Sequence, residues 1–554
     1  MHVLSAAEMQ ACDLATTVQF GVPSLELMRA ASAAVAAFAQ QQFPHARRVT
    51  VLCGTGNNGG DGMMAARLLS DAGLDVTTLL LGAPNKLAGD AAEAWLELSS
   101  HVHGLIHVVS APEDLAYHQA TLETDLILDA LVGTGFQPPL RGLALAALNW
   151  LHAKPAHAPI LAIDLPSGWP ADSIAATFDG SVFPADAVIT FTAPKPAHVF
   201  GQLTRQWDQP IVVAPIGSPD TAIVSQLDLH WSGSALSLTQ APRPAASNKG
   251  NFGHVLIVGG SLGSAGGKSG APAMASLAAL RAGAGLVTAA IPAPALPLVA
   301  AAAHELMTLP LTATPAGQIS AENLDPEFLA TLMADKTVLA IGPGLGQSAD
   351  TIKFTAVLLS GTKIPAVIDA DALNILAAKP ALLAQLARNG QRTLVLTPHP
   401  GEMARLAKIP IVEVQANRLE VARTFAQRNA VTLVLKGART LIAHPDGRVA
   451  VNTTGNPAMA KGGSGDLLTG LIAGILAQYP SAPAQAVEAA VYLHGLAADM
   501  AVAAADQHTL LATDSLAQFS RAFRFQSRGQ TGYVWLQGLP ADSSPTAPTH
   551  EAAK

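Results

Sequence analysis

The sequence predicts an α/β protein made of two halves, and three observations support this fold class. Strand-like apolar runs alternate with helical stretches from Val49 to about Val213, and the alternation resumes after residue 250. Such alternation is typical of parallel sheets covered by helices. The chain is 50% hydrophobic and only 13% charged, which suits sheets buried on both faces. Its 554 residues are too many for a single core, so we expect more than one domain.

The boundaries follow from changes in periodicity. We place the first domain at residues 1–225 and the second at 247–525. The pattern lapses between Pro215 and Ser247, so we expect a linker at 226–246. We also expect residues 526–554 to form a disordered tail, because they end in a polar, proline-containing run. Strands of the second half are expected at His254–Val258, Leu286–Ala290, Val338–Ile341, Ala366–Ile368, Thr393–Leu396 and Thr432–Leu435.

Composition excludes several classes of protein. A net charge of −8 without a basic block argues against a nucleic-acid partner. Cys12 and Cys53 are the only cysteines, so we expect no disulfide framework and a reducing compartment. The N-terminus lacks a basic leader, and apolar runs such as 298–303 are too short to span a membrane. We therefore expect a soluble, cytoplasmic protein with no membrane partner.

The first half carries a glycine-rich loop directly after its first strand. Gly54, Gly56 and Gly59 have the spacing of the dinucleotide fingerprint of Rossmann-like open sheets. The next strand ends in Gly82 without the acid that a dehydrogenase uses to hold the ribose, which weakens a hydride-transfer function. The polar residues from Asn57 to Asp61 can instead coordinate a hard cation or hold substrate hydroxyls.

Two further strands in this half end in acids. Asp129 is followed by a glycine-rich turn, and Asp164 is followed by Ser167. Singly, each aspartate is better explained as a turn or cap residue. Ligands of open α/β sheets, however, bind outside the carboxyl ends of strands. Together the three loops therefore favour one binding crevice.

These motifs resemble the N-terminal domain of NAD(P)H-hydrate epimerases, from Leu4–Met9 through the three loops to Phe191 and Lys195. The resemblance implies that the hydrated nucleotide is bound by Asn57, Asn58, Gly59, Gly60, Asp61, Gly133, Thr134, Gly135, Phe136, Gln137, Pro138, Pro139 and Asp164. It also implies a potassium ion (K+) at Asn58, Asp129 and Ser167. Asp164 is our candidate acid or base for epimerisation.

In the second half, a glycine-rich loop from Gly462 to Gly465 precedes an apolar helical stripe. Backbone N–H groups at a helix N-terminus favour an anion such as phosphate. Asp466 follows at once, and a carboxylate beside a phosphate is explained if it takes a proton from a neighbouring hydroxyl. The alternative is an ordinary acid in the first helical turn.

Four more segments of this half stand at strand ends. Gly342–Gly346 lets a ligand approach the backbone, and Asp371 is either a site acid or a helix N-cap. His399 is held between two prolines, and Lys436–Thr440 offers a cation and N–H groups to phosphates. The sequence Gly266–Ser269 is not a P-loop, because a leucine stands where that motif requires its first glycine.

Taken together, these segments resemble ADP-dependent NAD(P)H-hydrate dehydratases, which have a ribokinase-like α/β fold. The resemblance implies that ADP, with Mg2+, is bound by Lys436, Gly437, Ala438, Arg439, Thr440 and Gly465. The substrate contacts implied are Ala271, Gly346, His399 and Asp466. Two features depart from the family. The segment between Gly259 and Ala271 is longer than usual, and Lys461 replaces a threonine.

The resemblance implies repair of hydrated NADH and NADPH, the small molecules NADHX and NADPHX. The first half would interconvert the R and S hydrates, and the second would dehydrate the S hydrate with ADP. Asp466 would be the base that activates the ring hydroxyl for phosphoryl transfer. The alternative is a ribokinase-like small-molecule kinase with a non-catalytic N-terminal binding module. Nucleotide choice and a stable phosphorylated product would distinguish the two. We also expect a homo-oligomer.

Overall fold

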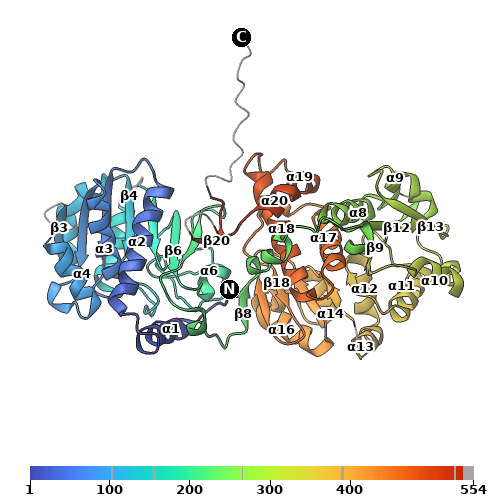
Figure 1. The fold of residues 1–554 in the computed structure, drawn as a ribbon, viewed down its shortest axis with the longest axis horizontal. Helices are drawn as coiled ribbons and strands as arrows, with labels where there is room; N and C mark the ends of the chain where they lie inside the picture. The colour runs from blue at the N-terminus through green and yellow to red at the C-terminus, as the bar shows by residue number, and fades with distance from the viewer. Residues whose placement is uncertain (101–103, 154–157, 265, 389–391, 529–531, 541–554) are drawn as a thin grey trace, which may run out of the picture. The chain divides into compact units, whose positions relative to one another are not determined.

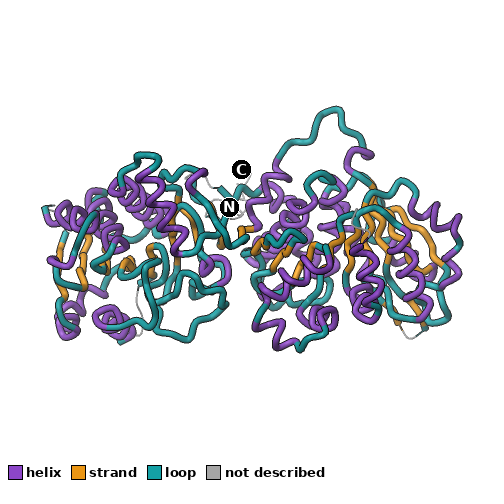
Figure 2. The backbone as a smooth tube through the Cα atoms, turned by 90° about the horizontal axis from the view of Figure 1, so that it is seen from below, coloured by secondary structure: helices purple, strands orange, loops and turns teal. Residues whose placement is uncertain are grey.

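The chain divides into two compact units in a computed structural model. The structure describes residues 1–540 except 101–103, 154–157, 265, 389–391 and 529–531. Unit 1 comprises Met1–Leu229 and Gln526–Lys554, and unit 2 comprises His230–Phe525. Each unit has its own sheet between helices (Figure 1; Figure 2). The expectation of two α/β halves is therefore confirmed.

Unit 1 is built on an eight-stranded sheet with the order β20-β7-β6-β5-β4-β1-β2-β3. All neighbours from β7 to β3 are parallel, and only β20 is antiparallel to its neighbour. The order reverses direction at β1, between β2 and β4, which creates the crevice where open sheets bind ligands. The strands are β1 Arg48–Cys53, β2 Asp75–Leu81, β3 Leu105–Val109, β4 Leu126–Ala130, β5 Ile160–Ile163, β6 Ala187–Phe191, β7 Ile211–Ala214 and β20 Val534–Gln537.

Helices cover this sheet, and one of them begins at the predicted glycine loop. Helix α3 starts at Asn57, and its glycines let it pack tightly on the strand ends, since a Cβ at Gly59 would collide with the carbonyl oxygen of Gly54. The helices of unit 1 are α1 Ala6–Val18, α2 Ser24–Gln42, α3 Asn57–Asp71, α4 Asp90–Ser99, α5 Gly142–His152 and α6 Pro196–Phe200.

The expected disordered tail is in part a strand. β20 pairs with β7 and closes that edge of the unit 1 sheet. Its Trp535 is buried, and the rings of Tyr533 and Trp535 meet Phe38 of α2 edge-on, with centroids 5.7 and 6.1 Å apart. The prediction was wrong here because two aromatic residues in a short segment bury enough apolar surface to order it. Residues 541–554 lie outside the described residues.

Unit 2 is built on a ten-stranded mixed sheet with the order β13-β12-β9-β14-β15-β16-β17-β18-β19-β8. Strands β13 to β17 run parallel, and β17, β18 and β19 are antiparallel. The six strands expected from sequence are present. The strands are β8 Leu229–Trp231, β9 His254–Val258, β12 Leu286–Pro292, β13 Met307–Leu311, β14 Val338–Ile341, β15 Ala366–Ile368, β16 Leu394–Leu396, β17 Thr432–Leu435, β18 Leu441–Ala443 and β19 Val449–Val451.

The helices of unit 2 include a closely packed pair, α8 and α17. A Cβ at Gly470 of α17 would collide with the carbonyl oxygen of Ala275 of α8, so glycine permits the contact. No helix in the described residues has both the length and the apolar character needed to cross a membrane. The helices are α7 Ser237–Gln240, α8 Gly270–Ala282, α9 Leu296–Ala300, α10 Pro326–Met333, α11 Ala349–Gly361, α12 Ala370–Ala378, α13 Pro380–Arg388, α14 Pro400–Ala407, α15 Ile411–Ala416, α16 Arg418–Asn429, α17 Ser464–Gln478, α18 Pro483–Val502, α19 Ala512–Ala517 and α20 Phe519–Arg524.

The expected linker at 226–246 is also structured, because β8 and α7 lie within it. Its His230 joins a buried polar cluster with His444 and with Glu488 of α18. Nε2 of each histidine lies 2.9 Å from Oε1 of Glu488, so both imidazoles donate to one carboxylate oxygen. The cluster therefore fastens this edge strand to the body of unit 2.

We expect the Glu488→Ala variant to lower the free energy of unfolding of unit 2 by about 3 kcal/mol, because two imidazoles would lose a buried acceptor. Burial opposes ionisation of Glu488, but the two histidines hold its pKa at about 2. Since this folded pKa lies below the unfolded value near 4.5, the stabilisation is present above pH 4.5 and is lost as pH falls toward 2. Urea unfolding at pH 7 and pH 3 checks this, with exposed Glu327→Ala as the control. An equal loss at both pH values would contradict it.

Candidate active sites

The predicted loops of unit 1 meet at a cavity of about 550 Å³ outside the carboxyl ends of β1, β4 and β5. This is the convergence that the three strand-end motifs predicted. Gly59 and Gly60 are instead buried inside α3, and Gln137, Pro138 and Pro139 do not line the cavity. The predicted residues that line it are Asn57, Asn58, Asp61, Gly133, Thr134, Gly135, Phe136 and Asp164.

Asp164 is held by a dense set of polar contacts at the end of β5. Its Oδ1 accepts from Nζ of Lys195 at 2.9 Å and from Oγ1 of Thr190 at 2.9 Å. Its Oδ2 accepts from the backbone N–H of Thr134 at 3.1 Å. The residue has φ of +65°, a left-handed conformation that non-glycine residues adopt at a cost and that is often found at functional sites.

The charge of Asp164 is fixed by Lys195. Burial opposes ionisation, but the ammonium of Lys195 and the hydrogen bonds hold the pKa of the Asp164 carboxyl below its ordinary value. The carbonyl of Asp164 accepts from Nε2 of His198 at 2.7 Å, because Nδ1 of that ring already accepts from the backbone N–H of Lys195. Burial lowers the pKa of His198 to about 4, so its ring is neutral. Asp164 is thus an ionised carboxylate facing the cavity.

The three residues expected to bind potassium lie on the same loops. Oγ of Ser167 donates to Oδ1 of Asp129 at 2.6 Å, and its backbone N–H donates to Oδ2 at 2.8 Å. Both carboxamide atoms of Asn58 are buried without a hydrogen-bond partner in the described part of the chain. A Cβ at Gly133 would lie 3.3 Å from Cγ of Asn58 and 3.1 Å from Oδ2 of Asp164, so glycine there lets the two side chains approach.

In unit 2 the predicted anion loop leads directly into α17. Gly463 is the N-cap with φ of +100°, a conformation that favours glycine, and the helix begins at Ser464. A Cβ at Gly465 would lie 3.6 Å from Nζ of Lys436 and 3.8 Å from Oδ2 of Asp369. The first turn of α17 therefore faces the cation at the end of β17, as the sequence predicts.

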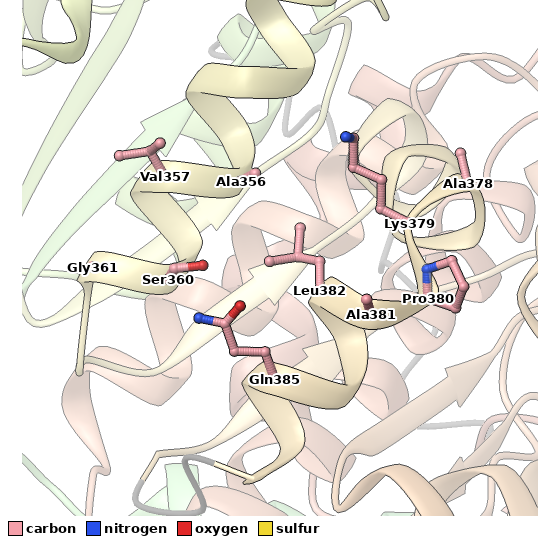
Figure 3. A pocket seen from close by; sticks show the side chains of 10 residues that line it. All are labelled: Ala356, Val357, Ser360, Gly361, Ala378, Lys379, Pro380, Ala381, Leu382 and Gln385. Carbon is pink, nitrogen blue, oxygen red and sulfur yellow. The ribbon is translucent and has the colours of Figure 1, made fainter.

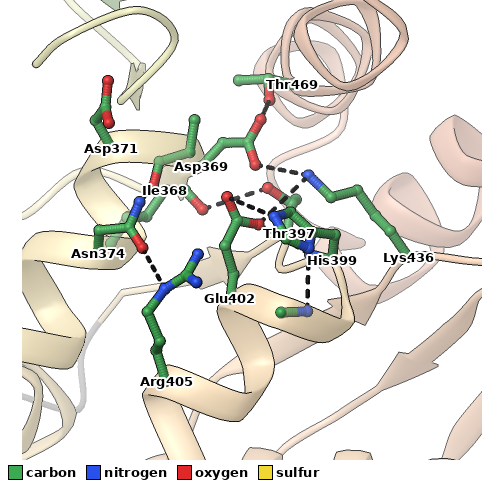
Figure 4. Close-up of polar contacts among 12 residues, drawn as sticks. Ile368, Asp369, Asp371, Asn374, Thr397, His399, Glu402, Arg405, Lys436 and Thr469 are labelled. Carbon is green, nitrogen blue, oxygen red and sulfur yellow. Dashed lines mark hydrogen bonds and ion pairs between the residues drawn. The ribbon is translucent and has the colours of Figure 1, made fainter. Parts of the chain in front are cut away.

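Lys436 is held by acids from two other strand ends (Figure 4). Its Nζ donates to Oδ1 of Asp369 at 2.9 Å and lies 3.9 Å from Oε2 of Glu402. Thr469 of α17 donates to the other oxygen of Asp369 at 2.8 Å. Burial opposes the charge of Lys436, but these acids and Asp466 raise its pKa, so it is a fixed cation.

His399 is the N-cap of α14, and its ring is half-exposed. Its Nδ1 accepts from the backbone N–H of Gly401 at 3.0 Å, and Oε2 of Glu402 accepts from the backbone N–H of His399 at 2.9 Å. These reciprocal contacts form a capping box. The imidazole is therefore presented rigidly at the edge of the site, as expected for a residue between two prolines.

Asp371 is not the N-cap of α12, because that cap is Asp369. Its Oδ2 accepts from the backbone N–H of Gly346 at 2.9 Å and from Nζ of Lys268 at 3.2 Å. Lys268 thus contributes to this region although it belongs to no P-loop. Its neighbourhood also contains Ala271, since a Cβ at Gly344 would lie 3.3 Å from Cβ of Ala271.

The carboxyl of Asp466, in unit 2, has a raised pKa. Burial and the neighbouring charge of Asp369 raise its pKa to about 6, although Lys436 and Lys268 act in the opposite direction. A carboxyl with this pKa is ionised near neutral pH and is still basic enough to accept a proton. Perturbed values of this kind cluster at functional sites.

Arg439 and Lys461, two cations predicted to lie near the nucleotide, donate hydrogen bonds to backbone carbonyls. Nη1 of Arg439 donates to the carbonyl of Thr453 at 3.1 Å, and burial lowers the pKa of its guanidinium to about 10. Nζ of Lys461 donates to the carbonyls of His508 and Leu510, each at 2.6 Å. In this structure neither charge is directed at the first turn of α17. Within the segment 436–440, Lys436 is the residue whose ammonium lies beside Gly465.

A second hollow, which belongs to unit 2, lies between α11 and α13 (Figure 3). It has a volume of about 800 Å³ and is lined by small and apolar side chains such as Val357 and Leu382. No residue predicted for either site lines it. Its lining offers no acid and a single cation, Lys379, so it lacks the groups of a catalytic centre.

Known proteins resemble both units. A family model described as YjeF-related protein N-terminus matches residues 24–197, and one described as NAD(P)H-hydrate dehydratase matches 255–521. The bifunctional NAD(P)H-hydrate repair enzyme of Moorella thermoacetica is 40% identical over 528 residues, covering 93% of this chain and 95% of that protein. This chain belongs to the bifunctional NAD(P)H-hydrate repair enzyme family.

Two further matches cover different shares of the chain. The family member from Escherichia coli is 36% identical and covers 90% of each chain. The structure of an ADP/ATP-dependent NAD(P)H-hydrate dehydratase from Bacillus subtilis is 30% identical, covers 53% of this chain and 96% of that chain, and has a TM-score of 0.44. For this repair enzyme, family membership bears out the Rossmann-like and ribokinase-like classes expected for its two halves.

The repair enzyme has site residues that sequence reasoning missed. Asp13 of α1 lines the unit 1 cavity, and Glu402 and Thr469 contact the unit 2 residues described above. Glu402 could have been found from the sequence, because it stands three residues after the N-cap position of a helix, where an acid forms a capping box. Asp13 and Thr469 could not have been found in this way, since each is an ordinary polar residue inside a helical pattern.

Proposed function

We propose that the two sites act in sequence on hydrated NADH and NADPH. The unit 1 cavity interconverts the R and S hydrates, and the unit 2 site dehydrates the S hydrate with ADP. The single observation that supports this best is that one chain carries both site constellations, in a family of bifunctional repair enzymes. Cys12 and Cys53, both buried and free, suit a reducing cytoplasm.

In unit 2, Asp466 accepts the proton of the ring hydroxyl while that oxygen receives a phosphoryl group from the nucleotide. The N–H groups at the start of α17, including that of Gly465, and the cation of Lys436 stabilise the phosphate charge. His399, Gly346 and Ala271 contact the hydrated ring. The C–O bond then breaks as the nitrogen lone pair forms a C=N bond and phosphate leaves, and loss of a proton from the adjacent ring carbon to solvent restores the dihydropyridine. Asp466 releases its own proton to solvent before the next turnover.

Mg2+ fits this site, because Asp369 and Asp466 are close enough for one charge to raise the pKa of the other. When bound with the nucleotide, Mg2+ neutralises charge on the phosphates. Asp466 and Asp369 are the residues that would lie nearest to it. The hydrogen bond from Lys436 orients the carboxylate of Asp369 in either case.

Potassium fits the unit 1 loops for a different reason. The buried carboxamide of Asn58 has no hydrogen-bond partner in the described residues, and a cation would satisfy its oxygen. Asp129 and Ser167 would complete the oxygen ligands together with loop carbonyls. When bound, the ion orders the loops that carry Asn58 and Gly133. Asp164 acts as the base that faces the substrate.

The experiment follows both hydrate epimers by chromatography, with ADP added and with ADP withheld. Without ADP, a sample enriched in one epimer should relax to the equilibrium mixture. With ADP, both epimers should disappear, and NADH or NADPH should form with release of phosphate. Disappearance of only one epimer would refute the epimerase assignment. Accumulation of a stable phosphorylated product would favour a kinase instead.

A further inference from the structure

Asp13 is an acid of the unit 1 cavity to which the proposed roles assign nothing. It lies on α1 and lines the cavity together with Asp61, Asp164 and Lys195. Helix α1 packs on the rest of unit 1 through its buried Met9 and Cys12, which form a hydrophobic cluster with Ala193 and Ala222. Asp13 therefore reaches the cavity from an element separate from the strand-end loops.

The carboxylate of Asp13 lacks the contacts that fix Asp164. Its Oδ1 is buried and has no hydrogen-bond partner in the described residues, and among them no other carboxylate has such an oxygen. Leaving a buried acceptor unsatisfied is costly, so such atoms call for an explanation. The polar part of a ligand in the cavity would satisfy Oδ1.

The surroundings of Asp13 and Asp164 shift the pKa values of their carboxyls in opposite directions. Burial raises the pKa of Asp13 to about 6, with Lys195 acting against the shift and Asp164 adding to it. The ionisable groups that face the cavity with it are Asp61, Asp90, Asp164 and Lys195. Two carboxyls whose surroundings separate their pKa values suit an acid and a base acting on one substrate.

We propose that Asp13 is the acid partner of Asp164 in the epimerisation, so that the two carboxyls act on opposite faces of the hydrated ring. This inference rests on the proposed epimerase function. In these hydrates the hydroxyl is on a ring carbon next to the ring nitrogen. Asp13 donates its proton to the hydroxyl oxygen, the C–O bond breaks, and the nitrogen lone pair forms a C=N bond as water leaves.

The reverse step completes the exchange of configuration. A water molecule adds to the other face of the same carbon, and Asp164 takes one of its protons as the C–O bond forms and the C=N electrons return to nitrogen. Water is lost and regained, and no electrons are exchanged with any other group. One proton passes overall from Asp13 to Asp164, and exchange with solvent restores both. The opposite epimer returns by the same steps in reverse, in which Asp164 gives back the proton that it took from water.

Asp61 is the rival acid, since burial and neighbouring acids also raise the pKa of its carboxyl. Its position near the start of α3 suits a role in binding the substrate. Asp13 differs because it comes from a separate element and its Oδ1 lacks a partner. The pH profiles of epimerisation by the Asp13→Asn and Asp61→Asn variants distinguish the two residues.

The test uses the Asp13→Asn variant of the full chain. We expect kcat for epimerisation without ADP to fall about 100-fold with KM changed less than about threefold, while ADP-dependent dehydration of the S hydrate keeps the wild-type rate. The wild-type rate should decline as pH rises above about 6, where the acid form is depleted. That decline should be absent from the residual rate of the variant, and Asp13→Glu should restore part of the activity.

Several results would overturn the inference. Asp13→Asn with wild-type kcat, or with lowered kcat and an unchanged pH profile, would show that Asp13 is not the acid. A pH decline abolished by Asp61→Asn but kept by Asp13→Asn would assign the acid to Asp61. The exposed Asp75→Asn is the matched control and should change nothing. If the wild-type chain itself does not epimerise, the proposed function fails and the inference fails with it.

Discussion

Replacing Asp466 with asparagine is expected to lower kcat for ADP-dependent dehydration about a thousandfold. Asparagine keeps the shape of the side chain but cannot take the proton of the ring hydroxyl, so nucleotide binding should change little. The measurement is formation of NADH from the S hydrate with ADP, together with a binding titration with ADP. Epimerisation in unit 1 should continue at the wild-type rate. A variant that repairs the hydrate normally would refute the base assignment.

The raised pKa of Asp466 leads to two further expected results, one for the pH dependence of the rate and one for thermal unfolding. Because the pKa of Asp466 is about 6 and its ionised form is required, the wild-type rate should rise with pH through 6 and then level off. The folded pKa lies above the ordinary 3.8, so the carboxyl disfavours the folded state as pH rises from 4 through 6. Asp466→Asn should therefore unfold at a higher temperature than the wild type at pH 8. The exposed Asp446→Asn serves as the control and should show neither effect.

Replacing Asp164 with asparagine is expected to stop epimerisation and to leave dehydration of the S hydrate intact. The change also leaves Lys195, which is 2% exposed, without its ionic partner at 2.9 Å. A single replacement should therefore destabilise unit 1, because an unpaired buried charge is costly. Loss of activity alone could then reflect loss of structure.

A double-mutant comparison separates these causes. Asp164→Asn, Lys195→Met and the double variant are compared by thermal unfolding and by epimerisation without ADP. The double variant has no unpaired charge, so its unfolding temperature should recover toward that of the wild type while epimerisation stays undetectable. A double variant that folds well and still interconverts the epimers would exclude Asp164 as the base.

The positions of the proposed functional loops could be predicted from the sequence, because the backbone conformation of these loops requires particular residue types. Glycines followed by acids at strand ends, as at Gly54 and Asp164, mark the carboxyl edge of a parallel sheet in any chain. His399 and Asp466 were accessible for a similar reason, since each is bounded by residues that fix a helix start.

The partners of these groups could not be read from sequence. Thr469 contacts Asp369 only because α17 crosses the end of β15, and nothing in the local pattern encodes that crossing. Asp13 occupies an unremarkable position in an amphipathic helix, and its importance arises from the helix lying against distant loops. The strands β8 and β20 were missed because short segments are ordered by the sheet edge they join, which is a tertiary effect.

The strand β20 is also the last element of unit 1 to be synthesised. Every residue of unit 2 is added to the chain before Trp535, so the sheet of unit 1 keeps an open edge at β7 until the chain is nearly finished. A chain stopped after Phe525 would keep every residue proposed for catalysis and yet lack the strand that covers that edge. Separating the two activities into independent proteins would thus require cutting the chain twice, because unit 2 is inserted within unit 1.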